Sequence, residues 1–307
     1  MCTTGRLASV EIRRLLARRL FRILVLLCLL GIVAAGVITF FQSSKDAGAG
    51  VARARAEQQG AVEGCMSGEF GPLPGEGKEG FDRRAGCEKF VGDLQVTDSR
   101  FHLSSLTEIF LGTTVPLAIL AWVLAASYVG AEWHAGTMTT LLTWEPRRVR
   151  VLLTKAGAAA LVLFLTGVVL QTLLGLALTP AAVFRGTTSG LGGNWAAETA
   201  GVIIRGSLIA TLAGIMGFSV ASVGRNTAAA LGVGFGYFTV VENLVRGLRP
   251  QWARWMVGDN AGRFILAKEL GFPPMDRTTL EAGALIVLYT LTLLVVAVTI
   301  FNRRDLT

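Results

Sequence analysis

The chain reads RILVLLCLLGIVAAGVITFF over residues 22–41, and this stretch carries one charge, Arg22, at its start. A helix needs about 20 mostly apolar residues to cross the hydrocarbon core of a bilayer, which is about 30 Å thick. The run is also longer than the apolar segment of a cleaved signal peptide, which has about 7 to 15 residues. We therefore interpret residues 22–41 as a transmembrane helix that stays in the protein as an anchor.

Five further stretches of the chain have the same length and apolar character. They cover residues 108–130, 153–178, 201–223, 227–245 and 280–301. Backbone groups inside a bilayer find no water, so a helix that satisfies them internally is the favoured spanning element. Hydrophobic residues make up 52% of the chain and charged residues 16%, which is too apolar for a water-soluble domain of this size. The predicted fold is an all-α membrane protein, a single six-helix domain over residues 1–307 with an outer loop region at 43–107.

Basic residues near the ends of the predicted spans indicate the orientation, because Lys and Arg close to a span tend to stay in the cytoplasm. They gather before the first span, between the second and third spans, and after the sixth: Arg6, Arg13, Arg14, Arg18, Arg19, Arg22, Arg147, Arg148, Arg150, Lys155, Arg303 and Arg304. This pattern predicts that both termini are cytoplasmic and that residues 43–107 lie outside. Residues 246–279 do not follow this pattern, because counting the spans places them outside although they contain six basic residues. We therefore expect an amphipathic segment at the membrane interface there.

Residues 6–20 place Leu7, Val10, Leu15 and Leu16 among arginines. This pattern is typical of a basic amphipathic helix that lies in the inner interface and is attracted to anionic lipid headgroups. A charge cluster that only directs topology fits the pattern equally well. Either interpretation keeps the N-terminus cytoplasmic.

Two of the four cysteines, Cys65 and Cys87, lie in the predicted outer loop, where oxidising conditions permit a disulfide. We predict that they are bridged, which would stabilise the loop by roughly 3 kcal/mol in the chain-entropy model. The alternative is a pair of free thiols. A thiol enzyme is not favoured, because the sequence has no Cys-x-x-Cys spacing and His102 is the only histidine in that loop.

The sequence contains no motif for a catalytic, metal or nucleotide site. The nearest approach to a phosphate-binding loop, at residues 75–79, lacks both the upstream glycine and the hydroxyl residue that the motif needs. The only histidines are His102 and His134, which argues against a metal site. The formal net charge of +8 is attributed to topology and anionic lipid, since the arginines are not interleaved with base-stacking aromatic residues, and no nucleic-acid partner is predicted.

Charged side chains inside predicted spans are candidates for function, because a charge at the bilayer centre costs about 2.5 to 3.5 kcal/mol on insertion scales. Glu242 lies in the fifth span, four residues before Arg246. It either pairs with Arg246 or with Arg205, or it lines a substrate path. The spans show no two paired carboxylates for a proton relay, which argues against an ion-coupled transporter.

Small residues at four-residue spacing predict places where helices approach closely. Gly232 and Gly236 form such a face in the fifth span, and Ala213, Gly217 and Ala221 form another in the fourth. Such faces pack helices within one bundle or between two chains.

The segment between the second and third spans reads GAEWHAGTMTTLLTWEPRR over residues 130–148. We expect a short helix that begins at Glu132, carries Leu141 and Leu142, and ends at Pro146. Such a helix would lie across the cytoplasmic surface, and its exposed face suggests a partner protein.

In this segment the chain resembles the permease subunits of bacterial ABC transporters of the type-2 exporter class. The matching pattern consists of Glu132, Gly136-Thr137, Leu141-Leu142, Pro146, Arg147-Arg148 and Lys155. The six-span plan, the basic start and the ending Phe301-Asn302-Arg303-Arg304-Asp305-Leu306 are similar too, whereas the outer loop at 43–107 is larger than in the smallest members.

The resemblance implies that the segment is a coupling helix, which docks on a separate cytoplasmic ATP-binding subunit. Glu132 would be its polar anchor, Gly136 and Thr137 its close-packing point, and Arg147 and Arg148 contacts to the partner or to lipid phosphates. It also implies a dimer with a second permease, either identical or related, in which the first and fifth spans line the contact.

The expected function is that of a permease subunit in an ATP-driven exporter of the bacterial cell membrane. It would move a drug, lipid or peptide by alternating access, and it would hold no cofactor itself, since ATP and Mg would be bound by the partner subunit. The alternative is a membrane-anchored sensor or resistance protein whose outer loop binds a peptide or antibiotic without moving it. A stoichiometric ATP-binding partner distinguishes the two.

Overall fold

The computed structural model describes residues 4–43, 47–68, 82–92, 100–138, 147–266 and 277–303. These residues form helices and connections, and among them the only β-type pairing is an isolated bridge between His102 and Thr187. Six helices are long and apolar enough to cross a membrane, and they coincide with the six predicted spans: Arg19–Gln42, Leu103–His134, Arg148–Arg185, Trp195–Gly224, Thr227–Leu248 and Thr279–Arg303. The prediction of an all-α, multi-pass membrane protein is confirmed.

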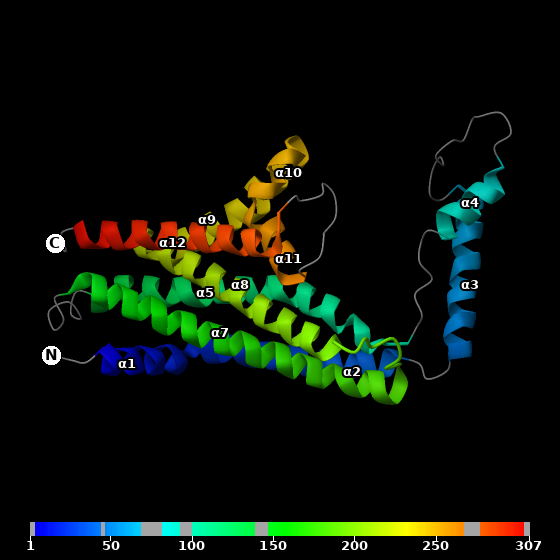
Figure 1. Cartoon of the computed structure of the whole chain (residues 1–307), viewed down its shortest axis with the longest axis horizontal. Helices are drawn as coiled ribbons and strands as arrows, with labels where there is room; N and C mark the ends of the chain where they lie inside the picture. Colours follow the sequence, from blue (N-terminus) through cyan, green and yellow to red (C-terminus); the bar gives the residue numbers. More distant parts are fainter. Residues whose placement is uncertain are drawn as a thin grey trace. The chain divides into compact units, whose positions relative to one another are not determined.

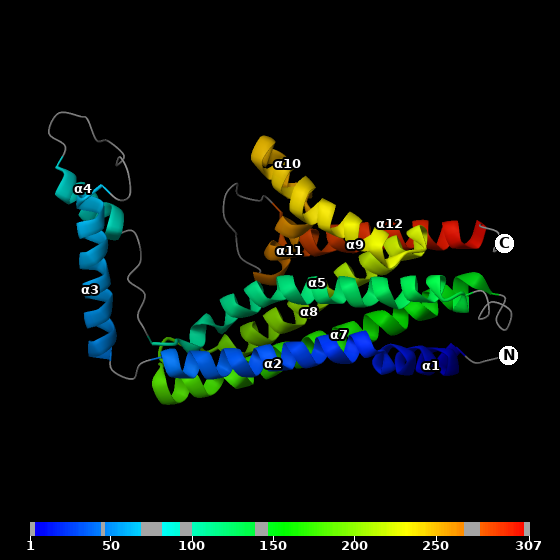
Figure 2. The same cartoon turned by 180° about the vertical axis from the view of Figure 1, so that it is seen from behind.

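The chain divides into two compact units (Figures 1 and 2). The first unit comprises Met1–Gly31, Leu106–Leu173 and Gly193–Thr307, and the second comprises Ile32–Ser105 and Leu174–Gly192. The predicted outer loop at 43–107 thus falls largely in the second unit. We describe each unit by itself.

In the first unit, α8 (Trp195–Gly224) is the central helix, with 72% of its apolar window buried. It packs against α5 (Leu106–His134), α7 (Arg148–Pro180) and α12 (Thr279–Arg303). The ring of Trp122 in α5 lies between Gly217 of α8 and Gly234 of α9 (Thr227–Phe235). A Cβ added to Gly217 would lie 2.9 Å from the Trp122 ring, and a Cβ added to Gly234 would lie 2.8 Å from it. The indole nitrogen of Trp122 also donates to the carbonyl oxygen of Ala230, 3.1 Å away.

Both described chain ends lie at the same end of the first unit (Figures 1 and 2). The C-terminal end of α5 contacts the C-terminal end of α12 through an edge-on ring contact between Trp133 and Phe301, with centroids 5.8 Å apart. It also contacts the turn after α8, where the Arg225 guanidinium lies 4.8 Å from the Trp133 ring centroid. In Figures 1 and 2, α1 (Thr4–Ala17) and the start of α7 lie at this end too. We call it the basic end, because Arg14, Arg147 and Arg303 all lie there.

The fifth span contains a π-helical turn and is followed by two short helices. α9 continues into a π-helical turn, η3 (Gly236–Val241), and then into α10 (Glu242–Leu248). The chain returns through η4 (Pro250–Trp255) and α11 (Val257–Leu266), which packs on α12 and α8. The segment predicted as interfacial at 246–279 therefore holds two short helices in its described part, and α11 is folded back on the bundle. Residues 267–276 lie outside the described residues.

The second unit holds a set of contacts between three segments that are distant in sequence. The hydroxyl of Ser43, at the end of α2 (Arg19–Gln42), donates to the Arg185 carbonyl at 2.8 Å and accepts from the Phe101 backbone N–H at 3.1 Å. Thr187 and residues 101–103 exchange two backbone hydrogen bonds of 2.9 and 3.0 Å. The Arg185 guanidinium lies 4.9 Å from the ring centroid of Phe40. The end of the first span, the entry to the second and the end of the third are thereby joined.

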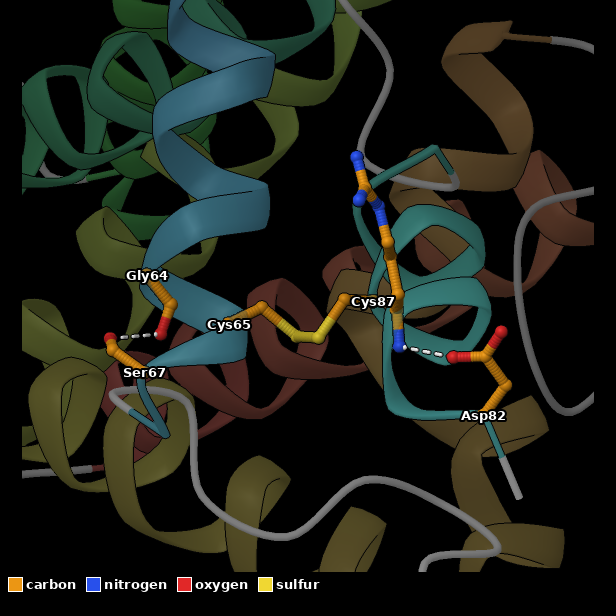
Figure 3. Close-up of a disulfide and its surroundings, with 6 residues drawn as sticks. Gly64, Cys65, Ser67, Asp82 and Cys87 are labelled. Atoms are coloured by element: carbon orange, nitrogen blue, oxygen red, sulfur yellow. Dashed lines mark hydrogen bonds between the residues drawn. A yellow bond between two sulfur atoms is a disulfide. The ribbon is translucent and has the colours of Figure 1, made fainter. Parts of the chain in front are cut away.

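The second unit also contains α3 (Ala47–Met66) and α4 (Arg83–Gly92), which are linked by a disulfide (Figure 3). It joins Cys65 to Cys87, with the two Cα atoms 5.8 Å apart. Both cysteines are buried together with Val91, and Ala61 and Val62 pack against them. The predicted bridge is confirmed.

Candidate functional site: a buried ion cluster

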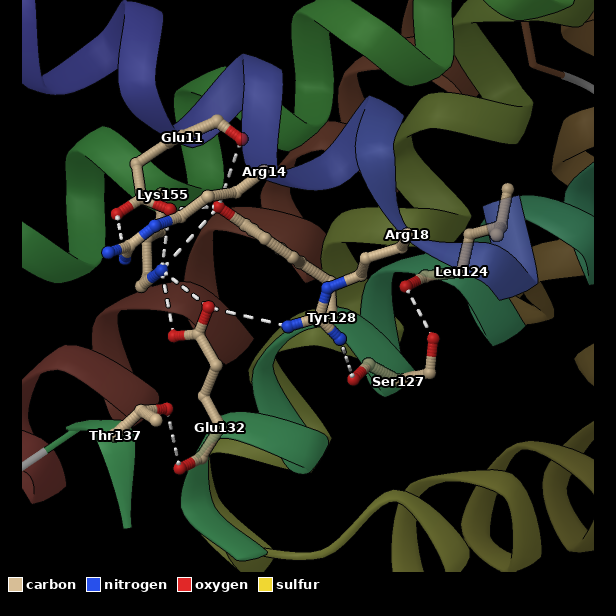
Figure 4. A network of polar contacts seen from close by, with 9 residues as sticks. All are labelled: Glu11, Arg14, Arg18, Leu124, Ser127, Tyr128, Glu132, Thr137 and Lys155. Atoms are coloured by element: carbon tan, nitrogen blue, oxygen red, sulfur yellow. Dashed lines mark hydrogen bonds and ion pairs between the residues drawn. The ribbon is translucent and has the colours of Figure 1, made fainter. Parts of the chain in front are cut away.

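Five side chains from three segments of the first unit meet at the basic end (Figure 4). Glu11 comes from α1, Arg18 from the junction between α1 and α2, Tyr128 and Glu132 from the last two turns of α5, and Lys155 from the second turn of α7. We call this group the ion cluster.

Lys155 is the centre of the ion cluster, and its side chain is only 1% exposed. Its Nζ lies 2.6 Å from Oε2 of Glu11, which is also 1% exposed, and 2.8 Å from Oε2 of Glu132. The same Nζ lies 4.8 Å from the centroid of the Tyr128 ring. One ammonium group therefore joins α1 to the end of α5.

Tyr128 and Arg18 complete the ion cluster. The Tyr128 hydroxyl donates to Oε2 of Glu11, and its ring is fully buried. Arg18 donates to the Ser127 carbonyl at 3.0 Å, lies 3.4 Å from Oε1 of Glu132, and places its guanidinium 4.9 Å from the Tyr128 centroid. The break between α1 and α2 is thus fixed on the second span.

The ion cluster balances two carboxylates against two cations, so the buried group carries no formal net charge. Such balance is required because an unpaired buried charge costs several kcal/mol, whereas a well-formed buried pair is close to neutral for stability. Arg14 adds a third cation 3.6 Å from Oε1 of Glu11, but its side chain is 51% exposed. The ion cluster fixes α1, α5 and α7 to one another. Each of its charged groups is paired within the cluster, so none of them is free to act on a substrate.

The expected position of Glu132 on a separate surface helix is wrong. α5 continues to His134, so Glu132 lies in the last turn of the second span, and its side chain is 10% exposed. Its carboxylate faces Lys155 and Arg18 rather than a partner protein. The charges around it explain why, since the pairing with Lys155 and Arg18 offsets the cost of burying its carboxylate.

Gly136 lies in the turn that follows the end of α5. Its φ is +67°, in the left-handed region that favours glycine, and its N–H donates to the Trp133 carbonyl at 3.2 Å. An added Cβ would meet no atom within 4 Å, so the conformation, and not crowding, accounts for the glycine. The Thr137 hydroxyl donates to the Glu132 carbonyl at 3.3 Å and caps the same helix end.

The remainder of the predicted coupling segment is described only in part. Residues 139–146, with Leu141, Leu142 and Pro146, lie outside the described residues. Arg147 precedes α7 and is exposed, and Arg148 is half-buried at its first position.

Glu242 is buried, and it pairs locally. Its Oε1 accepts the Gly258 backbone N–H at 3.0 Å, and its Oε2 lies 3.9 Å from Arg246, as the spacing in the sequence suggested. Arg246 approaches Asp259 more closely, at 3.1 Å. The alternative pairing with Arg205 is not formed, because the Nε of Arg205 donates to the Gly201 carbonyl on its own helix at 3.1 Å.

The two predicted small-residue faces have different surroundings. In the fourth span, Gly217 and the buried Ala221 pack inside the bundle, and Ala213 beside them is half-buried. In the fifth span, an added Cβ at Gly232 or Gly236 would meet no atom within 4 Å. The face of Gly232 and Gly236 is therefore uncovered in the single chain.

The comparison with known families covers the region from just before α5 to the end of the chain. Residues 96–307 match the model of a family described as protein of unknown function (DUF2705). The chain belongs to this family. No curated protein matches it. The matched DUF2705 region includes Tyr128, Glu132 and Lys155, while Glu11 and Arg18 precede it.

The sequence reasoning missed Glu11, Tyr128 and Lys155 as members of one site. One signal for Glu11 was present, because it is the only acidic residue among the first 40. A lone carboxylate on a basic helix that is expected to contact anionic lipid requires a local cation. Lys155 was interpreted as a topological charge, although it stands inside an otherwise apolar run.

Proposed function

We propose that this DUF2705 chain is the membrane permease subunit of an ATP-driven exporter of the bacterial cell membrane, similar to the type-2 class of ABC transporters. A separate cytoplasmic subunit would bind ATP and Mg and hydrolyse the nucleotide. The basic end would face the cytoplasm, so that both termini lie on that side. The substrate class, as expected from the sequence, is hydrophobic or amphipathic.

The observation that carries the proposal is the connection from the 135–147 segment into the ion cluster. A partner that moves this segment would pull on the last turn of α5, where Glu132 is bound to Lys155 of α7 and to Arg18. Displacement would therefore reach α1, α5 and α7 together, since a charge pair buried in this way resists separation. In this proposal the whole ion cluster, and not Glu132 alone, is the coupling element, and the docking contacts are made by residues after Glu132.

A second permease would cover surfaces that the single chain leaves open. Only 6% of the apolar window of α2 and 17% of that of the fifth span are buried, against 72% for α8. The uncovered face of Gly232 and Gly236 lies in the fifth span and suits close contact with another helix. These two spans are the ones that the resemblance places at the permease dimer contact.

The test is a purification of the tagged chain in mild detergent from cells that express its natural partners, followed by mass spectrometry and an ATPase assay. We expect an ATP-binding subunit at one per permease. Ala135→Asp, which changes an exposed residue beside the ion cluster without touching it, should release that subunit. Ala85→Asp on α4 is the matched control, since it adds the same charge to another exposed alanine and should retain the subunit. A solitary chain without ATPase activity would refute the proposal.

The sensor alternative has one observation in its favour, which is the disulfide-linked pair of α3 and α4 in the predicted outer region. A sensor would bind its ligand through that pair and would not need a stoichiometric ATPase. The same purification therefore decides between the two functions.

A further inference from the structure

A groove of about 720 Å³ runs between α1 and α7 in the first unit. Its apolar wall consists of Ala8, Ile12, Val149, Leu153, Gly157 and Leu161. Leu153 and Leu161 are about half exposed, so this wall is open on one side. We call it the α1–α7 groove. It lies on α7 beside the ion cluster, with the buried Lys155 between the groove residues Thr154 and Gly157 in the sequence.

One end of the α1–α7 groove is basic. Arg147 and Arg150 line it there, and the lining residues include no carboxylate. The same end coincides with the first turn of α7, where the helix dipole favours an anion. An occupant should therefore carry negative charge at this end and apolar surface beyond it.

The length of the groove excludes a soluble protein as its occupant. Leu161 lies 14 residues beyond Arg147, which is about 20 Å along a helix. Half of the hydrocarbon core is only about 15 Å thick, so an occupant that reaches both ends enters the core from the interface. A water-soluble partner docked on the basic end cannot follow the wall to Leu161.

We propose that the α1–α7 groove binds an anionic phospholipid. Its phosphate lies against Arg147 and Arg150 at the start of α7, and one acyl chain lies along the wall from Val149 to Leu161. A lipid bound there contacts both α1 and α7, and so adds to the contacts between these helices that the ion cluster makes. The site does not depend on an ATPase partner, because every group that forms it belongs to this chain.

The test is native mass spectrometry of the purified chain titrated with phosphatidylglycerol and, separately, with phosphatidylcholine. We expect one phosphatidylglycerol to be retained per chain in preference to phosphatidylcholine. Arg147→Gln with Arg150→Gln should lower the affinity for phosphatidylglycerol roughly 30-fold, since each guanidinium near the surface adds about a fivefold gain for anionic lipid. Arg13→Gln with Arg19→Gln removes the same charge from exposed positions outside the groove and should leave the affinity unchanged.

A second variant tests the acyl-chain wall without any change in charge. An added Cβ at Gly157 would meet no atom within 4 Å, so Gly157→Leu fills the groove without a clash in the fold. It should abolish the retained lipid, whereas Gly112→Leu, at an equally open glycine of α5, should not. Equal retention of both lipids, or full retention by Gly157→Leu, would overturn the proposal. So would loss of a co-purifying protein, with lipid retained, in the double arginine variant.

Discussion

Lys155 is buried because two carboxylates neutralise and surround it. Replacing it by methionine, which has a similar length, would leave Glu11 and Glu132 buried, with Arg18 and the half-exposed Arg14 as the remaining cations. Breaking a buried pair in this way costs about 3 to 5 kcal/mol. We predict that Lys155→Met strongly lowers the thermal stability of the detergent-solubilised chain, measured by the temperature at which its size-exclusion peak is lost.

Arg14→Met is the matched control, because it removes a cation from the same group at a side chain that is 51% exposed. It should change stability by less than about 1 kcal/mol. Adding Glu11→Gln and Glu132→Gln to Lys155→Met should restore part of the lost stability, since the buried negative charges are then gone. Equal effects of Lys155→Met and Arg14→Met would show that the ion cluster does not support the fold.

The ion cluster could not be predicted from a single sequence, and the reason is physical. Glu11 and Lys155 are 144 positions apart, and nothing local indicates which face of α1 turns inward. Among the apolar residues of α1, Leu15 is 1% exposed while Val10 and Leu16 are 45% and 43% exposed. Glu11 and Leu15 are buried against the bundle, so the amphipathic pattern of α1 describes only part of its surroundings.

At the scale of elements, Trp122 sets the distance between α5, α8 and α9. Its indole fills the space above Gly234, where an added Cβ would come within 2.8 Å of the ring. Overpacking of this kind costs about 1 to 3 kcal/mol. We predict that Gly234→Ala lowers the thermal stability of the purified chain, although alanine is the better helix former.

Gly232→Ala supplies the control, because it changes the same residue type two positions earlier in the same helix. An added Cβ there meets no atom within 4 Å, so the higher helix propensity of alanine, up to about 1 kcal/mol, should dominate. The two variants should therefore move stability in opposite directions. A Gly234→Ala chain as stable as the Gly232→Ala chain would mean that the tryptophan is not wedged between the helices.

The spans could be predicted because their cause is local. Each apolar run is long enough on its own, and a helix pairs the backbone of such a run within the bilayer. The end of α5 could not be predicted in the same way. Glu132 was interpreted as a surface residue, because the two cations that allow its burial belong to other helical segments and are distant in the sequence. The π-helical turn η3 is a further feature that the hydropathy of residues 227–245 does not indicate.

At the scale of the whole molecule, six membrane crossings would place both chain ends on the same side of the membrane. Six crossings return the chain to the side from which it started, and the contact between Trp133 and Phe301 joins the end of the second span to the end of the sixth. Residues between the first and second spans would then lie on the opposite side. The basic end is therefore expected in the cytoplasm, where arginines near span ends are retained.

We predict that a cysteine at Ser67 reacts with a membrane-impermeant maleimide on intact cells and that a cysteine at Ser9 reacts only after the membrane is opened. Both serines are exposed, Ser67 after α3 and Ser9 on α1. The measurement needs a background in which Cys2 and Cys28 are replaced, while Cys65 and Cys87 stay bridged. Labelling of Ser9→Cys but not Ser67→Cys on intact cells would show that the molecule has the opposite orientation in the membrane. The 135–147 segment would then face outward, no cytoplasmic ATPase could reach it, and the exporter proposal would fail even though the fold is unchanged.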